Sequence, residues 1–187
     1  CKEVPLTEDF QLQADKVIAA MDDHTKLTWI CSPNNPSGNS YDHESIRKVI
    51  VAAKGIVVID EAYIDFSTEK SWLYELEKYP NLVVLQTFSK AWGLANCRLG
   101  MMLASKEIIS VINKIKLPYN MNGMMQKYAC EILSKYASQK DDYVEEILAE
   151  RKKLIPELEK IPTVQKIYPS DANFLLVKIN NAHEVYK

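Results

Sequence analysis

The stretch from Gln86 to Gly100, QTFSKAWGLANCRLG, lies between two apolar runs and constrains the fold more than any other part of the chain. Residues 82–85 before it and 99–104 overlapping its end have the composition of buried strands, which are short and almost continuously apolar. Thr87, Ser89 and Lys90 therefore follow the carboxyl end of a strand. Open α/β sheets bind ligands at that edge, so the sequence predicts an α/β domain with a ligand site here.

The residue types in this stretch suit pyridoxal phosphate. That cofactor needs an amine to form an imine with its aldehyde, donors for its phosphate and an acid near its ring nitrogen. Lys90 would supply the amine. Thr87, Ser89 and Arg98 would supply the donors, since a planar guanidinium suits a phosphate dianion. The alternative is a surface lysine behind a helix-capping serine, and a Ser-Lys pair alone would favour that alternative.

The segment TFSKAWGLANCRLG resembles the lysine signature of fold-type I aminotransferases, and in detail it is most similar to the histidinol-phosphate aminotransferase family. The resemblance implies that Lys90 forms the imine with the cofactor and that Arg98 holds the cofactor phosphate. It also implies an α/β fold, the fold-type I large domain, with a mostly parallel sheet flanked by helices. Asn96 stands where the family commonly has a small residue, and we expect this departure to be tolerated.

A second polar loop follows an earlier strand candidate, residues 27–31. Its sequence, SPNNPSG from Ser32 to Gly38, predicts a turn because it is rich in proline, asparagine and glycine. A plain connector is the alternative interpretation. The tract resembles the Asn-Pro-x-Gly element of the same aminotransferases, which implies that Asn35 hydrogen-bonds the ring hydroxyl of the cofactor.

A third strand candidate, residues 56–59, consists of four β-branched apolar residues and leads into Asp60, Glu61 and Tyr63. Burying a carboxylate is costly unless a partner compensates its charge. A protonated pyridine nitrogen is such a partner, so Asp60 is the candidate for that role and Tyr63 for the ring hydroxyl. An aspartate that caps the next helix is the alternative, and Glu61 is a rival acid. The same Asp-Glu-Ala-Tyr sequence occurs in the family, which favours the cofactor role.

Helical periodicity predicts further elements along the chain. Apolar spacing predicts helices within residues 7–23, 42–53, 69–79, 105–117, 124–136 and 141–160. We expect Ile108, Ile112 and Ile115 to lie in the core, and Pro156 to kink or split the last helix. Residues 164–168 and 173–179 predict two more strands. The chain would then form part of a large cofactor-binding domain over residues 1–137 and the start of a small α+β C-terminal domain over residues 138–187.

Composition excludes several classes of function. The 187 residues carry a formal net charge of -2, which gives no electrostatic case for binding nucleic acid or an anionic membrane. No apolar run approaches the ~20 residues of a membrane span, and the five glycines form no dinucleotide or nucleoside-triphosphate loop. The four cysteines and three histidines are scattered, so we expect no metal site, free thiols and a cytoplasmic location.

The resemblance implies a reaction and partners. We expect a two-stage transamination with histidinol phosphate as amino donor and a 2-oxo acid, 2-oxoglutarate, as acceptor, in histidine biosynthesis. The loop at residues 118–122 resembles the family's Tyr-Asn-x-Asn segment, which implies that it approaches the partner subunit's site in a homodimer. A plain connection between two helices is the alternative interpretation. The alternatives are an aromatic aminotransferase, an amino-acid-phosphate decarboxylase and a non-catalytic cofactor-binding regulator.

The chain begins at Cys1 rather than at a methionine, and we expect it to be a piece of a longer protein. Family members have a cofactor-phosphate loop upstream of this stretch and a substrate-binding arginine downstream of it. We therefore expect residues 1–187 alone to be inactive.

Overall fold

The computed structural model describes residues 1–186. Its helices are α1 (Ala14–Ala20), α2 (His43–Ala52), α3 (Lys106–Ile115), α4 (Gly123–Lys135), α5 (Ala137–Glu159) and α6 (Ala182–Val185). Its strands are β1 (Leu27–Cys31), β2 (Ile56–Asp60), β3 (Leu82–Thr87), β4 (Gly100–Ala104), β5 (Val164–Ile167) and β6 (Val177–Ile179). Three short 3-10 helices, η1 (Ile64–Phe66), η2 (Trp72–Glu75) and η3 (Ala95–Cys97), lie in the connections.

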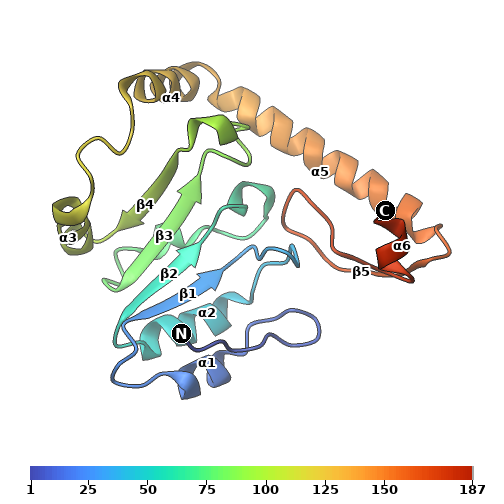
Figure 1. The fold of residues 1–187 in the computed structure, drawn as a ribbon, viewed down its shortest axis with the longest axis horizontal. Coiled ribbons are helices and arrows are strands. Elements are labelled where there is room, and N and C mark those ends of the chain that lie inside the picture. Colours follow the sequence, from blue (N-terminus) through green and yellow to red (C-terminus); the bar gives the residue numbers. More distant parts are fainter. Residues whose placement is uncertain (187) are drawn as a thin grey trace.

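The main sheet has the order β1-β2-β3-β4, in which β1, β2 and β3 are parallel and β4 is antiparallel (Figure 1). Cys31 pairs with Asp60, and Asp60 pairs with Leu85 on the other side. The carboxyl ends of the three parallel strands therefore meet at one edge. The loops that carry Asn35, Tyr63 and Lys90 all leave from that edge.

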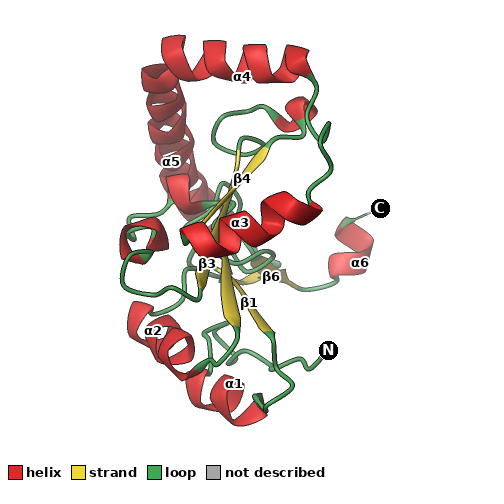
Figure 2. Cartoon of the chain, turned by 90° about the vertical axis from the view of Figure 1, so that its left-hand side faces the viewer, coloured by secondary structure: helices red, strands yellow, loops and turns green. Residues whose placement is uncertain are grey.

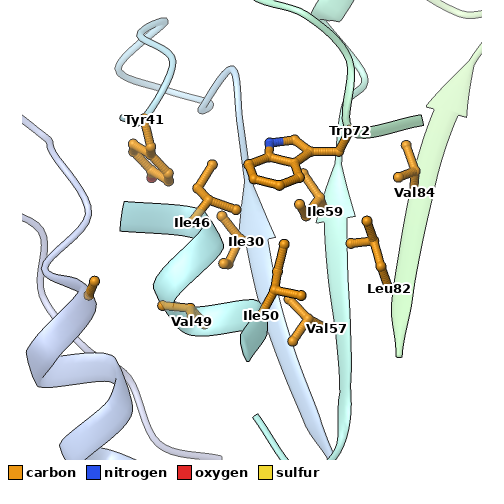
Figure 3. Packing of buried hydrophobic residues seen from close by; sticks show 11 residues of the cluster. Ile30, Tyr41, Ile46, Val49, Ile50, Val57, Ile59, Trp72, Leu82 and Val84 are labelled. Atoms are coloured by element: carbon orange, nitrogen blue, oxygen red, sulfur yellow. The ribbon is translucent and has the colours of Figure 1, made fainter. Parts of the chain in front are cut away.

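The larger hydrophobic cluster, the sheet cluster, lies between the sheet and α1 and α2 (Figure 3). In α2 the buried residues follow helical spacing, and the cluster members of β2 and β3 alternate along each strand because they share one face of the sheet. Val58 and Val83, between them on the other face, are also buried. The Asp42 carboxylate accepts a hydrogen bond from Ser45 N at 2.8 Å and so caps the first turn of α2. The members are Ala14, Ile30, Tyr41, Ile46, Val49, Ile50, Val57, Ile59, Trp72, Leu82 and Val84.

A smaller cluster, the site cluster, packs where the loops leave the sheet edge. Its residues come from η1, the loop after β3, the long helix α5 and the connection between β5 and β6. This cluster thus joins the later part of the chain to the sheet edge, and Figure 1 shows that connection turning back from β5 toward β1 and β2. The buried members are Tyr63, Phe66, Ala91, Val144 and Ala172, with Ala62, Leu148 and Phe174 packed against them.

The predicted core position of the α3 isoleucines is wrong. None of the ten residues of α3, all of which the structure describes, is buried, and Ile115 is 74% exposed. Figure 2 shows α1 and α2 at one end of the molecule, α4 at the other and α3 between them. Figure 1 places α3 beside β4, the edge strand at the far side of the sheet from β1, and among the described residues neither α3 nor β4 contributes a member to the sheet cluster. Helical periodicity identifies an apolar face, but it does not say whether this part of the chain covers that face.

Three secondary-structure predictions also need correction. The segment 69–79 forms only the 3-10 turn η2. Helix α5 begins at Ala137, earlier than the predicted residue 141, and it is not split at Pro156. Pro156 lies in the last turn of the helix, so the one backbone hydrogen bond that a proline removes is lost near the helix end. Residues 173–176 are not part of a strand. The Ser170 hydroxyl there donates to Phe174 O at 2.6 Å and holds a turn instead.

The predicted boundary at residue 138 falls at the start of α5. The two-domain division stays a prediction, and its last residue, Lys187, lies outside the described residues. No helix within residues 1–186 combines the length and the hydropathy needed to cross a membrane.

Candidate active site

A cavity of about 360 Å³ opens at the carboxyl edge of β2 and β3. Its lining combines an amine, a guanidinium, two hydroxyls and a carboxylate within one small volume. Five of the residues predicted from the sequence are among the lining residues, which are Asp60, Ala62, Leu85, Gln86, Thr87, Ser89, Lys90 and Arg98. Asn35 and Tyr63, the other two predicted residues, do not line it directly.

The turn after β3 fixes the position of Lys90. The Thr87 hydroxyl accepts a hydrogen bond from Ser89 N at 3.1 Å and donates to Leu99 O at 3.3 Å, which ties the turn to the start of β4. Phe88 N also donates to Leu99 O, at 3.1 Å. The turn is therefore bonded to the residue that leads into β4, and Lys90 follows this anchored backbone.

Lys90 and Asn35 both contact Tyr63. Lys90 Nζ lies 5.1 Å from the centroid of the Tyr63 ring, within the range of a cation–π contact. Asn35 Nδ2 donates a hydrogen bond to the Tyr63 hydroxyl at 3.1 Å. The two predicted residues outside the cavity lining are thus joined to each other and, through the Tyr63 ring, to Lys90.

Asp60, rather than Glu61, is the acid that faces the cavity. One Asp60 carboxylate oxygen accepts a hydrogen bond from Ala62 N at 3.1 Å, which closes the turn after β2. Within residues 1–186, no protein donor bonds the other oxygen, Oδ2, so it is available to a ligand. This geometry gives Asp60 both a local structural contact and a free acceptor.

Glu61 is buried on the other side of the strand end, with only 1% of the residue exposed. Its carboxylate accepts hydrogen bonds from Ser71 Oγ at 2.5 Å, Trp72 N at 2.7 Å and Gln86 Nε2 at 2.9 Å. Burial raises the pKa of Glu61, and these hydrogen bonds oppose that shift. Because both oxygens already accept hydrogen bonds from protein donors and Glu61 is not among the residues that line the cavity, the rival assignment of Glu61 to a cofactor has no geometric support.

Arg98 has a left-handed backbone, with φ of 49°. Such a conformation is strained for a residue with a side chain, and strain of this kind clusters at functional sites. Its Nη1 donates to Ala95 O at 3.2 Å, which steadies the guanidinium at the cavity wall. The other nitrogens of the planar group remain suited to an anionic ligand.

Residues 1–187 match the family described as Aminotransferase class I and II. The chain belongs to this family. It is similar to proteins named histidinol-phosphate aminotransferase from Parabacteroides distasonis, at 54% identity over 186 residues, and from Cytophaga hutchinsonii, at 51% identity over 183 residues. These alignments cover 100% and 98% of this chain but 54% and 52% of the two relatives. The chain therefore spans about half the length of the curated relatives it matches.

Among solved structures, the histidinol-phosphate aminotransferase of Clostridium acetobutylicum superposes with a TM-score of 0.85 at 28% identity, over 94% of this chain and 54% of that one. The predicted fold class, the α/β fold of fold-type I aminotransferases, is confirmed.

Sequence reasoning missed Gln86, which lines the cavity and also bonds Glu61. Its place at the end of β3, one residue before Thr87, was the available signal. Reasoning also missed Phe174, which packs edge-on against Tyr63. No local pattern marks that residue, because its contact joins segments that are far apart in the sequence.

Proposed function

We propose that this chain is part of a pyridoxal-phosphate-dependent aminotransferase that uses histidinol phosphate as amino donor and 2-oxoglutarate as acceptor, in histidine biosynthesis. The observation that carries the proposal is the single cavity in which Lys90, Asp60 and Arg98 converge. The 54% identity to a protein named histidinol-phosphate aminotransferase supports the choice of donor.

The residues present fit the cofactor. Thr87, Ser89 and Arg98 offer two hydroxyls and a guanidinium, a donor set suited to a phosphate dianion. Asp60 Oδ2 would accept from the protonated ring nitrogen. Asn35 and Tyr63, already bonded to each other, offer donors to the ring hydroxyl.

Bound pyridoxal phosphate supplies a sink for the electrons left on the substrate's Cα when its proton departs. The chain's own residues perform the remaining tasks. Lys90 would hold the cofactor through its amine and, once displaced by the substrate's amine, would take the proton from the substrate's Cα and pass it to the cofactor. The Asp60 carboxylate would keep the ring nitrogen protonated, because its negative charge stabilises that cation.

The proposal also covers the substrates, the partner subunit and the cellular location of the complete protein. The site would take a small amino donor and a small 2-oxo acid, and the complete protein would be a homodimer, whose partner subunit would be approached by the loop at residues 118–122. Exposed apolar side chains of α3 and α4, such as Val111, Ile115 and Met124, are consistent with a surface that is covered in the complete protein. The four cysteines are free thiols, which supports a cytoplasmic location.

An assay of the full-length protein with 2-oxoglutarate tests the proposal by comparing three donors: histidinol phosphate, an aromatic amino acid and threonine phosphate. We expect the highest kcat/KM for histidinol phosphate. Preference for the aromatic donor, or release of carbon dioxide from threonine phosphate, would contradict the proposed substrate while leaving the cofactor site in place.

A further inference from the structure

The connection between β5 and β6 contacts Tyr63 and the turn that contains Asn35, the two residues that would meet the cofactor's ring hydroxyl. Residues 170–174 of this connection are named the bracing loop here. They approach the sheet edge from the later part of the chain, and they touch the Asn35 turn and the Tyr63 ring by separate contacts.

The first contact is aromatic. The Phe174 ring packs edge-on against the Tyr63 ring, with centroids 5.2 Å apart and planes at 86°. Aromatic pairs prefer this geometry. The same Tyr63 ring has Lys90 Nζ 5.1 Å from its centroid, and its hydroxyl accepts from Asn35. Phe174 is therefore one of the groups that fix the orientation of the Tyr63 side chain.

The second contact holds the turn that contains Asn35. Asp171 N donates to Gly38 O at 2.7 Å, and the Asp171 carboxylate accepts from Ser40 N at 2.9 Å. Gly38 has φ of +84°, and a Cβ built there would lie 2.7 Å from Ser170 Oγ. The turn and the bracing loop thus meet at a distance that only glycine allows.

The bracing loop is itself held in place. Ala172 is fully buried in the site cluster, and its carbonyl accepts a hydrogen bond from Arg151 Nη1 of α5. The Ser170 hydroxyl closes the loop by donating to Phe174 O at 2.6 Å. A loop anchored to α5 and closed on itself can support the groups that it touches.

We infer that Phe174 is a positioning residue for the proposed reaction: by packing on Tyr63, it keeps the Tyr63 hydroxyl beside Asn35, where both would bond the ring hydroxyl of the cofactor. This inference rests on the proposed function. Removal of the Phe174 ring leaves Tyr63 without its edge-on neighbour, so the Tyr63 side chain loses its fixed orientation. The ring hydroxyl of the cofactor then lacks the Tyr63 hydroxyl as a hydrogen-bond donor for part of the time.

The test uses the full-length protein loaded with pyridoxal phosphate. Its readout is the pH at which the visible absorption of the bound cofactor changes, since that pH responds to hydrogen bonds at the ring hydroxyl. Tyr63→Phe removes the hydroxyl and defines the full shift. We expect Phe174→Ala to shift the pH in the same direction by at least half as much, and Phe174→Leu to shift it less.

Leu148→Ala is the matched control, because Leu148 packs against the same cluster from α5. We expect it to destabilise the protein without shifting the absorption change. An unchanged pH for Phe174→Ala beside a shifted Tyr63→Phe would overturn the positioning role alone, as would an equal shift for Leu148→Ala. If Phe174→Ala does not fold, Phe174→Leu decides the matter by the same comparison. A wild-type protein with no cofactor absorption would overturn the proposed function itself.

Discussion

The sheet cluster and the site cluster are built in different ways. The sheet cluster joins regular elements that follow one another closely, between Ala14 and Val84, and most of its members sit at the periodic positions of a helix or a strand. The site cluster joins residues from 62 to 174, drawn mainly from loops and turns. The sheet cluster has eleven buried members and the site cluster has five. Because stabilisation grows with the apolar area buried, we expect the sheet cluster to contribute more to stability, whereas the site cluster places Tyr63 and other side chains of the candidate site.

The largest expected effect on stability lies in the sheet cluster. Ile50→Ala removes a side chain that is 1% exposed, between α2 and the sheet, and we expect it to lower the free energy of unfolding by ~2–5 kcal/mol. Its neighbour Val51 is 70% exposed, so Val51→Ala is the matched control and should cost less than ~0.5 kcal/mol. Urea unfolding of the full-length variants measures both. Equal costs would contradict the assigned packing of α2.

The site should show the opposite pattern. Asp60→Asn removes the charge that faces the cavity, and we expect kcat to fall by ~10²–10³, equivalent to ~2.7–4 kcal/mol, as for other preorganised electrostatic groups. The free energy of unfolding should change little, because the amide oxygen can still accept from Ala62 N. Steady-state kinetics and urea unfolding of one preparation test both statements. Near-normal turnover of Asp60→Asn would contradict a catalytic role for the Asp60 charge and would leave Asp60 only its structural role in the turn after β2.

The junction between the Asn35 turn and the bracing loop should be intermediate in its effect. Gly38→Ala places a Cβ at 2.7 Å from Ser170 Oγ on a backbone with φ of +84°, and we expect it to cost ~1–3 kcal/mol of stability. The control is Gly123→Ala at the start of α4, where a Cβ meets nothing within 4 Å; it should be neutral or stabilise the protein by up to ~1 kcal/mol. Thermal unfolding that ranks the two variants equally would place the close approach in doubt.

The smallest effect concerns pH. Because burial raises the pKa of Glu61 above its ordinary value of 4.5, the folded state binds this proton more tightly than the unfolded state. The resulting stability is present below about pH 4.5 and is lost as the pH rises through the raised pKa. Relative to Glu61→Gln, wild-type protein should therefore lose stability as the pH increases from 4.5 toward neutrality.

Glu145→Gln in α5 changes an exposed carboxylate and is the control for the Glu61 comparison. Urea unfolding at several pH values follows all three proteins. A stability difference between wild type and Glu61→Gln that grows in favour of the wild type as the pH rises would reverse the expected sign and contradict the account of Glu61.

Much of the sheet and its edge could be predicted from sequence, because the information there is local. The β-branched run before Asp60 and the apolar run before Thr87 both form strands, and parallel pairing brings their ends together. The contact between Phe174 and Tyr63 could not be predicted, since it depends on how α5 directs the later chain. Likewise, the apolar spacing of α3 says nothing about which segment covers its exposed face.

The central claim is that Lys90 is the lysine that binds the cofactor, and covalent mapping tests it most directly. The full-length protein is incubated with pyridoxal phosphate and reduced with borohydride, and its peptides are then analysed by mass spectrometry. The account predicts a pyridoxyl group on Lys90, with none on Lys140, whose Nζ is 3.0 Å from Asp65 and 2.6 Å from Asp141. A pyridoxyl group on any other lysine, with Lys90 unmodified, would contradict the assignment of this cavity as the active site.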